Sequence, residues 1–120
     1  MLSLDTPQLA AVGFFIENPF HVVQVDCAVN NITFAHELGH NLGACDDRDS
    51  SGDCEGSSAF AHGYQDTENQ FRTIMSYDCP VSGGCPRVNR WSNPQQRFLT
   101  RILGIPQLAD NVRSLNAFVR

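Results

Sequence analysis

Apolar and β-branched residues form two short runs near the start of the chain and predict two strands. Residues 10–16 (AAVGFFI) predict the first strand and residues 20–25 (FHVVQV) predict the second. The residues between them, Glu17-Asn18-Pro19, are typical of a turn. The chain therefore begins with a predicted strand–turn–strand unit.

Apolar residues then recur about every 3.6 residues instead of every second residue, which predicts a helix that ends near residue 42. Asn30 or Asn31 can cap its amino terminus, and Gly43 suits the left-handed conformation that often follows a helix. At about 100° per residue the apolar side chains share one side: Ile32, Ala35, Leu38 and Leu42, with Phe34 at the edge. The two histidines of this segment lie roughly opposite. We therefore expect the apolar side to pack on a sheet and the histidines to face a cleft.

The rest of the chain alternates between polar loops and short apolar stretches. Loops are predicted at 46–58, 79–86 and 90–94, around apolar stretches at 59–64 and 71–77. Val112, Leu115 and Val119 are spaced as on one side of a helix. Residues 110–119 are therefore predicted to form a closing helix.

These elements predict an α+β fold in one domain made of residues 1–120. Residues 1–43 are expected to form an N-terminal subdomain with the central helix, and residues 44–120 an irregular C-terminal subdomain with the terminal helix. Two strands make a marginal sheet, and the apolar side of the helix needs a larger one. We therefore expect a partial twisted sheet, with further strands preceding Met1 or supplied by another chain.

Composition and charge narrow the possible partners. The chain has 42% hydrophobic and 18% charged residues, as in ordinary globular domains, and a net charge of −5. Binding of nucleic acid needs a basic face, which this charge does not favour. No apolar run has membrane-spanning length, and the first residues lack the pattern of a signal peptide. We expect a monomer that binds neither nucleic acid nor a membrane.

Five cysteines in 120 residues favour an oxidising compartment and hence an extracellular protein. Cys79 can close a small loop with Cys85, and Cys45 another with Cys54, which leaves Cys27 over. Five choices of the odd cysteine and three pairings of the other four allow fifteen patterns, so this pairing is a hypothesis. A secreted protein without a leader of its own is expected to be part of a longer precursor.

Two histidines and a glutamate have the spacing of a metal site. His36 and His40 stand four residues apart and share one helix face, so both imidazoles can bind one ion. Glu37 beside them can reach a metal-bound water. Gly43 lets the helix end, and Asp46 can return as a third ligand. We therefore predict a Zn²⁺ site; a polar surface helix explains neither the glycine nor the acidic residue.

Two segments together resemble the metzincin zinc peptidases, and most closely the bacterial reprolysin-like metalloendopeptidases. Residues 33–44 (TFAHELGHNLGA) resemble the motif H-E-x-x-H-x-x-G-x-x-H, and residues 73–77 (TIMSY) resemble the Met-turn that follows it. The likeness extends from Phe20 to about Asn116 and includes residues 87–94 (RVNRWSNP). It implies a metzincin-like catalytic domain and a zinc-dependent endopeptidase that hydrolyses proteins or peptides through a metal-activated water.

Asp46 is a departure from the family's commonest pattern. Most metzincins have a third histidine at this position, and a minority, the snapalysin type, have aspartate. An anionic ligand lowers the net charge of the site, so we expect zinc there to be a weaker Lewis acid. Asp47 lies one residue late and Cys45 one residue early, and both remain competing ligands.

The resemblance also implies roles for residues around the metal. Glu37 would be the general base, and Met75 would form an apolar floor beneath the ion. Tyr77 matches a tyrosine that ligates the metal or donates to the oxyanion, although a purely structural role is equally consistent. Residues 75–94 would line the primed side of the cleft, where the loop at 80–86 would shape side-chain preference.

Other candidates are weaker. His62 and His21 are predicted to be structural, because the ligand set is complete without them. The segment from Asp47 to Gly52 begins like a Ca²⁺ loop, but Ser58 stands where its closing glutamate belongs, so a solvated acidic loop is favoured. The rival function is a truncated remnant that binds zinc without turning over substrate, since strands that would hold the substrate are expected to be missing.

Overall fold

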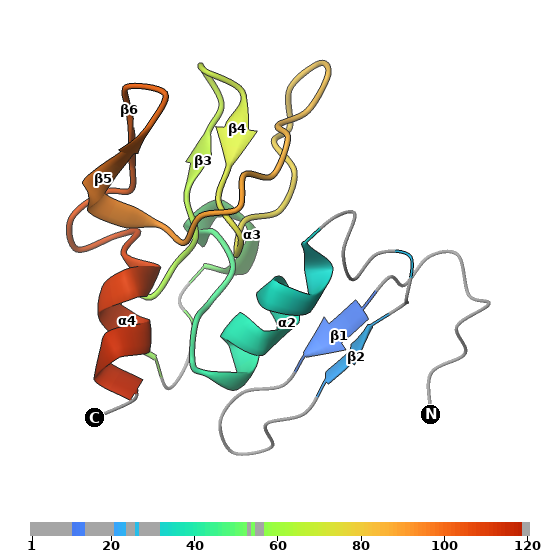
Figure 1. Cartoon of the computed structure of the whole chain (residues 1–120), viewed down its shortest axis with the longest axis vertical. Helices are drawn as coiled ribbons and strands as arrows, with labels where there is room; N and C mark the ends of the chain where they lie inside the picture. The colour runs from blue at the N-terminus through green and yellow to red at the C-terminus, as the bar shows by residue number, and fades with distance from the viewer. Residues whose placement is uncertain are drawn as a thin grey trace.

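The computed structural model describes residues 11–13, 21–23, 26, 32–52, 54 and 57–118. Among these residues, helix α2 (Thr33–Asn41) lies between a two-stranded sheet and the segments of the C-terminal half (Figure 1). Helices and small sheets occur together, which agrees with the predicted α+β class. The division of the chain at residue 43 stays a prediction.

Strands β1 (Ala11–Gly13) and β2 (His21–Val23) pair antiparallel and pack against α2. The register places Ala11 opposite Val23 and Gly13 opposite His21. Both strands fall inside the predicted ranges. The outer residues of those ranges and the predicted turn lie outside the described residues.

Helix α2 has Ile32 at its N-cap position and ends as predicted. Ile32 has φ 57°, and its side chain makes no capping hydrogen bond. The predicted caps, Asn30 and Asn31, lie outside the described residues. A β-branched residue at positive φ is strained by roughly 1–3 kcal/mol.

The carboxyl end of α2 is a glycine-stopped turn. Gly43 has φ 87°, and its N–H donates to the His40 carbonyl at 3.1 Å. The Ala44 N–H donates to the Gly39 carbonyl at 2.9 Å. These two bonds form the Schellman arrangement that a glycine permits, so the predicted role of Gly43 is confirmed.

The C-terminal half contains more structure than the sequence predicted. Helix α3 (Arg48–Ser51) lies inside the predicted loop 46–58, and α4 (Asn111–Phe118) confirms the closing helix. Two antiparallel hairpins complete the described part: β3 (Gln65–Asp66) with β4 (Phe71–Arg72), and β5 (Asn93–Phe98) with β6 (Arg101–Leu103). The end of the predicted loop 90–94 is therefore the start of β5. No helix within the described ranges is long and apolar enough to cross a membrane.

The core lies where α2 meets the C-terminal half. Buried Ala44, Ile74 and Met75 form its centre, and four partly buried side chains pack around them: Ile32, Ala35, Trp91 and Leu115. The expected apolar face of α2 is only partly used. Leu38 and Phe34 remain 37% and 52% exposed, whereas the histidine side is almost completely buried. The expectation of a buried apolar face and an open histidine face is therefore corrected, because the C-terminal half packs on the histidines.

Two disulfides are present among the described residues. Cys45 is bonded to Cys54, and Cys79 to Cys85, as the sequence spacing suggested. The Cys45–Cys54 bridge ties the segment that follows α2 to the loop that follows α3. Cys27 lies outside the described residues.

Candidate metal centre

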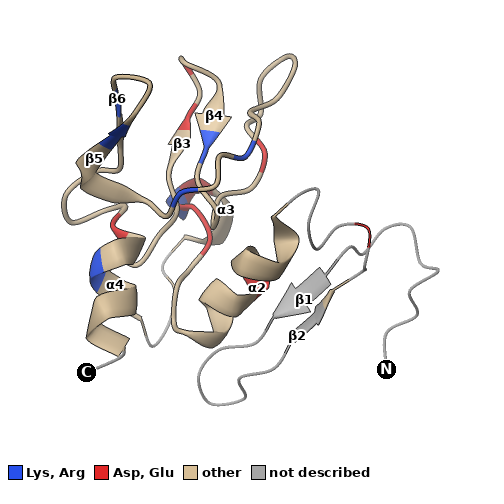
Figure 2. Ribbon diagram, viewed as in Figure 1, with Lys and Arg blue, Asp and Glu red and all other residues tan. Residues whose placement is uncertain are grey.

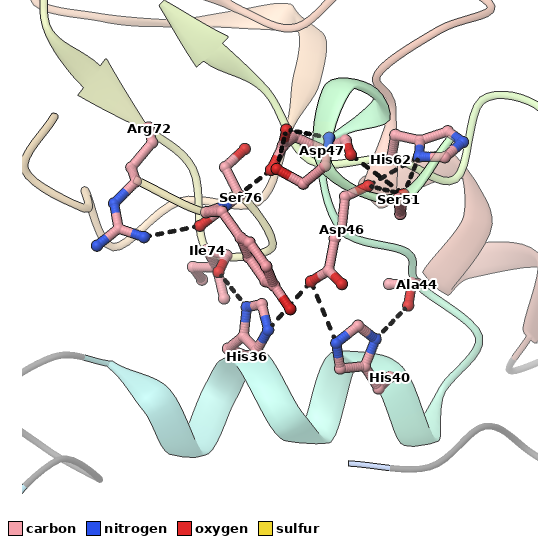
Figure 3. Close-up of polar contacts among 12 residues, drawn as sticks. His36, His40, Ala44, Asp46, Asp47, Ser51, His62, Arg72, Ile74 and Ser76 are labelled. Atoms are coloured by element: carbon pink, nitrogen blue, oxygen red, sulfur yellow. Dashed lines mark hydrogen bonds and ion pairs between the residues drawn. The ribbon is translucent and has the colours of Figure 1, made fainter. Parts of the chain in front are cut away.

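Two imidazoles from α2 and one carboxylate from the segment after it converge on one point (Figure 3). The Nε2 atoms of His36 and His40 each lie 3.2 Å from Oδ1 of Asp46. Zinc bonds of about 2.0–2.1 Å in a tetrahedron separate neighbouring ligand atoms by roughly 3.3 Å. The three atoms therefore have the spacing of ligands to one zinc ion.

Both imidazoles are held in the orientation that a metal requires. His36 donates from Nδ1 to the Ile74 carbonyl at 2.8 Å, and His40 donates from Nδ1 to the Ala44 carbonyl at 3.0 Å. A carbonyl only accepts hydrogen bonds, so each Nδ1 carries the hydrogen. When the rings are neutral, the lone pair is on Nε2, directed toward Asp46.

Electrostatics at this point favour a cation. Burial raises the pKa of Asp46, but the hydrogen bonds from His36 and His40 outweigh burial and hold that pKa at about 2. Burial lowers the pKa of His40, yet the hydrogen bond and charge of Asp46 raise it above its ordinary value overall. Without a metal, positive charge is therefore stabilised between the rings and the carboxylate, where a cation would lie.

The two competing ligands have other partners. Asp47 is buried and accepts from the Tyr77 N–H at 2.8 Å through Oδ1. Its Oδ2 accepts hydrogen bonds from the backbone N–H and the hydroxyl of Ser50, so Asp47 is the N-cap of α3. Cys45 is committed to the disulfide with Cys54. The geometry thus favours Asp46 over either neighbour.

A buried histidine fixes the backbone of Asp46. The Cys45 N–H donates to the Ala61 carbonyl at 2.7 Å, and the Gly63 N–H donates to the Cys45 carbonyl at 3.2 Å. Between these bonds, His62 donates from Nδ1 to the Asp46 carbonyl at 2.7 Å. The structural role predicted for His62 is confirmed, but its effect on Asp46 was missed. No sequence pattern signals it, since the two residues are 16 apart.

Glu37 and Tyr77 lie beside the candidate ligand atoms. Glu37 is buried, and it offers a carboxylate oxygen within 4.8 Å of ring nitrogens of His36 and His40. The Tyr77 ring lies 6.3 Å from the His36 ring, centroid to centroid. The charge of Asp46, then burial, then the charge of Glu37 raise the pKa of Tyr77, so its hydroxyl stays protonated.

The segment around Met75 lies against the helix that carries the histidines. Met75 is completely buried, and its Cε lies 3.2 Å from where a side chain on Gly39 would begin. The preceding residue, Ile74, supplies the carbonyl that holds His36. Met75 therefore packs beneath the helix turn between the two histidines, and its assignment as a Met-turn stays a prediction.

Comparison with known proteins places the chain in a family. A family model of Metallo-peptidase family M12 matches residues 6–92, a range that includes the whole cluster. The chain is 39% identical over 109 residues to a peptidyl-Asp metalloendopeptidase of Stenotrophomonas maltophilia (strain R551-3), across 88% of this chain and 25% of that relative. It is 39% identical over 106 residues to one from Xanthomonas campestris pv. campestris, across 88% and 24%.

A shorter match, 46% identical over 71 residues, is to a peptidyl-Asp metalloendopeptidase of Pseudomonas fragi and covers 58% of this chain and 46% of that relative. The chain thus spans about a quarter of the length of the first two relatives. No solved structure matches. Since the family model matches more than half of it, the chain belongs to metallopeptidase family M12.

Proposed function

We propose that this chain carries the catalytic centre of a zinc-dependent endopeptidase. The observation that carries the proposal is the triangle of His36 Nε2, His40 Nε2 and Asp46 Oδ1, with both Nδ1 atoms tied to carbonyls. These three residues would hold the ion and leave a position for water. Bound zinc would lower the pKa of that water and polarise a peptide carbonyl.

Glu37 and Tyr77 supply the proton chemistry of the proposed reaction. The Glu37 carboxylate, next to both histidines, accepts a proton from the attacking water and passes it to the leaving amine. The Tyr77 hydroxyl, kept protonated by the neighbouring carboxylates, donates to the developing oxyanion. Half of the Tyr77 surface is exposed, so the hydroxyl is accessible to a substrate.

The substrates would be proteins and peptides. The relatives are named peptidyl-Asp metalloendopeptidases, and we propose that this chain likewise cleaves bonds next to aspartyl residues. Its two disulfides suit an extracellular protein. The proposal needs neither nucleic acid nor a membrane, and it takes the protein to be a secreted monomer.

The test compares three proteins: the wild-type chain, Glu37→Gln, and a matched control, Glu68→Gln, at an exposed position in the β3–β4 turn. We expect wild type to bind one zinc and to cleave casein and Asp-containing peptides. Glu37→Gln should bind zinc equally and lose at least about 100-fold in kcat/KM, the usual size of a general-base effect. Glu68→Gln should match wild type.

Two outcomes would overturn the proposal. Wild-type cleavage by Glu37→Gln would remove the general base from the mechanism. Zinc binding without any cleavage by the wild-type chain would instead support the inactive-remnant alternative.

A further inference from the structure

Two arginines meet at one carbonyl group near the metal-binding atoms. Arg72 on β4 donates from Nη1 to the Ser76 carbonyl at 2.9 Å, and Figure 3 shows its guanidinium directed at that oxygen. Arg87 donates from Nη2 to the same oxygen at 3.2 Å. The two cations are therefore held close together, where like charges repel. Burial, and then the charge of Arg72, lower the pKa of Arg87 to about 10.

Both arginines line a hollow of about 390 Å³. Its other lining residues are Ile32, Asp78, Gly83, Cys85 and Pro86. The hollow lies near the candidate ligands, since Arg87, which lines it, interacts electrostatically with Glu37 and Asp46. The Ile32 carbonyl accepts the N–H of His36, one helical turn further on. The Ser76 carbonyl comes two residues after Ile74, whose carbonyl holds His36.

Acidic groups also lie near the arginine pair. Asp78 is the acidic residue that lines the hollow; it is exposed, and its Oδ1 lies 4.0 Å from Nε of Arg72. That same oxygen accepts the N–H groups of Cys79 and Cys85. Glu37 and Asp46 also attract Arg87, and the proposed function places both at the metal and the reacting water. Basic and acidic residues alternate on and beside β4, as the blue and red segments show (Figure 2).

We propose that Arg72 and Arg87 form the subsite that binds the carboxylate side chain of the substrate residue next to the scissile bond. This inference rests on the proposed function and assigns residues to its substrate preference. Planar guanidinium groups bind carboxylates through paired, charge-assisted hydrogen bonds. The Ser76 carbonyl and, for Arg72, the Cys85 carbonyl hold the donors in place before the substrate arrives. An amide side chain of the same shape lacks the charge and should bind less well.

The test uses matched peptides that differ only by Asp or Asn, placed on either side of one scissile bond. We expect wild type to prefer Asp on one side, and Arg72→Gln and Arg87→Gln each to reduce the Asp/Asn ratio of kcat/KM about 10- to 100-fold, the size of a charged hydrogen bond. Arg101→Gln, at an exposed position on β6, is the matched control and should keep the ratio. Arg87→Lys retains the charge and should keep part of the preference.

A binding measurement separates failure of this inference from failure of the proposed function. Asp and Asn peptides are titrated against Glu37→Gln, alone and combined with each arginine substitution, by fluorescence polarisation, with zinc content and circular dichroism confirming the fold. If wild type cleaves Asp and Asn peptides equally, or if both arginine variants keep the ratio, the inference is wrong and the proposed function stands. If no peptide is cleaved, the proposed function fails. In that case the ratio of affinities for the Asp and Asn peptides tests the subsite. If neither arginine substitution changes this ratio, the subsite assignment is wrong; if they reduce it, the assignment is supported.

Discussion

Replacing Asp46 with asparagine should weaken zinc binding, whereas the same replacement at its neighbour Asp47 should weaken the fold instead. Asp46→Asn keeps the shape of the side chain but removes the charge at the point where the two Nε2 atoms converge. Asp47→Asn also removes one charge, but from a carboxylate that accepts hydrogen bonds from Tyr77 and Ser50. The two substitutions are chemically identical and one residue apart, so each is the control for the other.

The structure gives the direction and scale of the effect at Asp46. Burial raises its pKa, but hydrogen bonds from His36 and His40 lower it from 3.8 to about 2, which favours the ionised form by about 2 kcal/mol. A divalent ion in place of the ring protons would stabilise the carboxylate further, and a further gain of about 2 kcal/mol means that Asp46→Asn should weaken zinc binding about 30-fold. Asp47→Asn should change zinc affinity little and lower the free energy of unfolding by about 1–2 kcal/mol, because one amide oxygen cannot replace both carboxylate oxygens.

Competition against a fluorescent zinc chelator measures the affinities, and urea unfolding of the metal-free proteins measures the stabilities. If Asp47→Asn abolished zinc binding while its fold persisted and Asp46→Asn bound zinc normally, the ligand assignment would have to move by one residue. If neither substitution weakened binding, the carboxylate would not be a ligand.

Further outcomes follow from Gly39 and from the pKa shifts. Gly39→Ala should lower the free energy of unfolding by about 1–2 kcal/mol, since a methyl group there meets the Met75 side chain. A double-mutant cycle with Met75→Ala should be non-additive, and additivity would argue against that contact. The lowered pKa of Asp46 stabilises the metal-free chain above pH 3.8 and is lost as pH falls through about 2; the raised pKa of His40 stabilises it below pH 6.5 and is lost as pH rises through that raised value. The melting-temperature difference between wild type and Asp46→Asn, both metal-free, should therefore be largest between pH 3.8 and 6.5, and a difference that grows above pH 8 would contradict this sign. Zinc uptake near pH 6 should release protons, detected by calorimetry in buffers of different ionisation enthalpy.

The candidate ligands could be identified from the sequence because their signal is local. The four-residue spacing alone places His36 and His40 on one helix face. Gly43 ends that helix because glycine readily adopts the positive φ that the turn requires. Asp46 comes three residues after Gly43, close enough for the chain to turn back toward the two histidines. None of these inferences needed knowledge of tertiary structure.

The partners that hold the imidazoles could not be predicted, because they come from elsewhere in the fold. The carbonyl that orients His36 belongs to Ile74, 38 residues away, and backbone carbonyls leave no mark in a sequence. The β5–β6 hairpin was missed for a different reason. Its turn residues, Leu99 and Thr100, have φ values of 47° and 73°, positions where asparagine and glycine are the usual signal.

Chelation of the metal should leave the fold of the described C-terminal half intact. The rings of His36 and His40 are oriented by the carbonyls of Ile74 and Ala44, and the backbone of Asp46 by His62 and the Cys45–Cys54 disulfide. All of these contacts are made by protein groups, so an ion would enter a site that is already arranged and would only have to replace protons. Circular dichroism of the chain with and without chelator should therefore agree, with a lower melting temperature as the main change. Loss of helix signal on chelation would show that the ion itself organises the site, as in small zinc modules that fold only with metal.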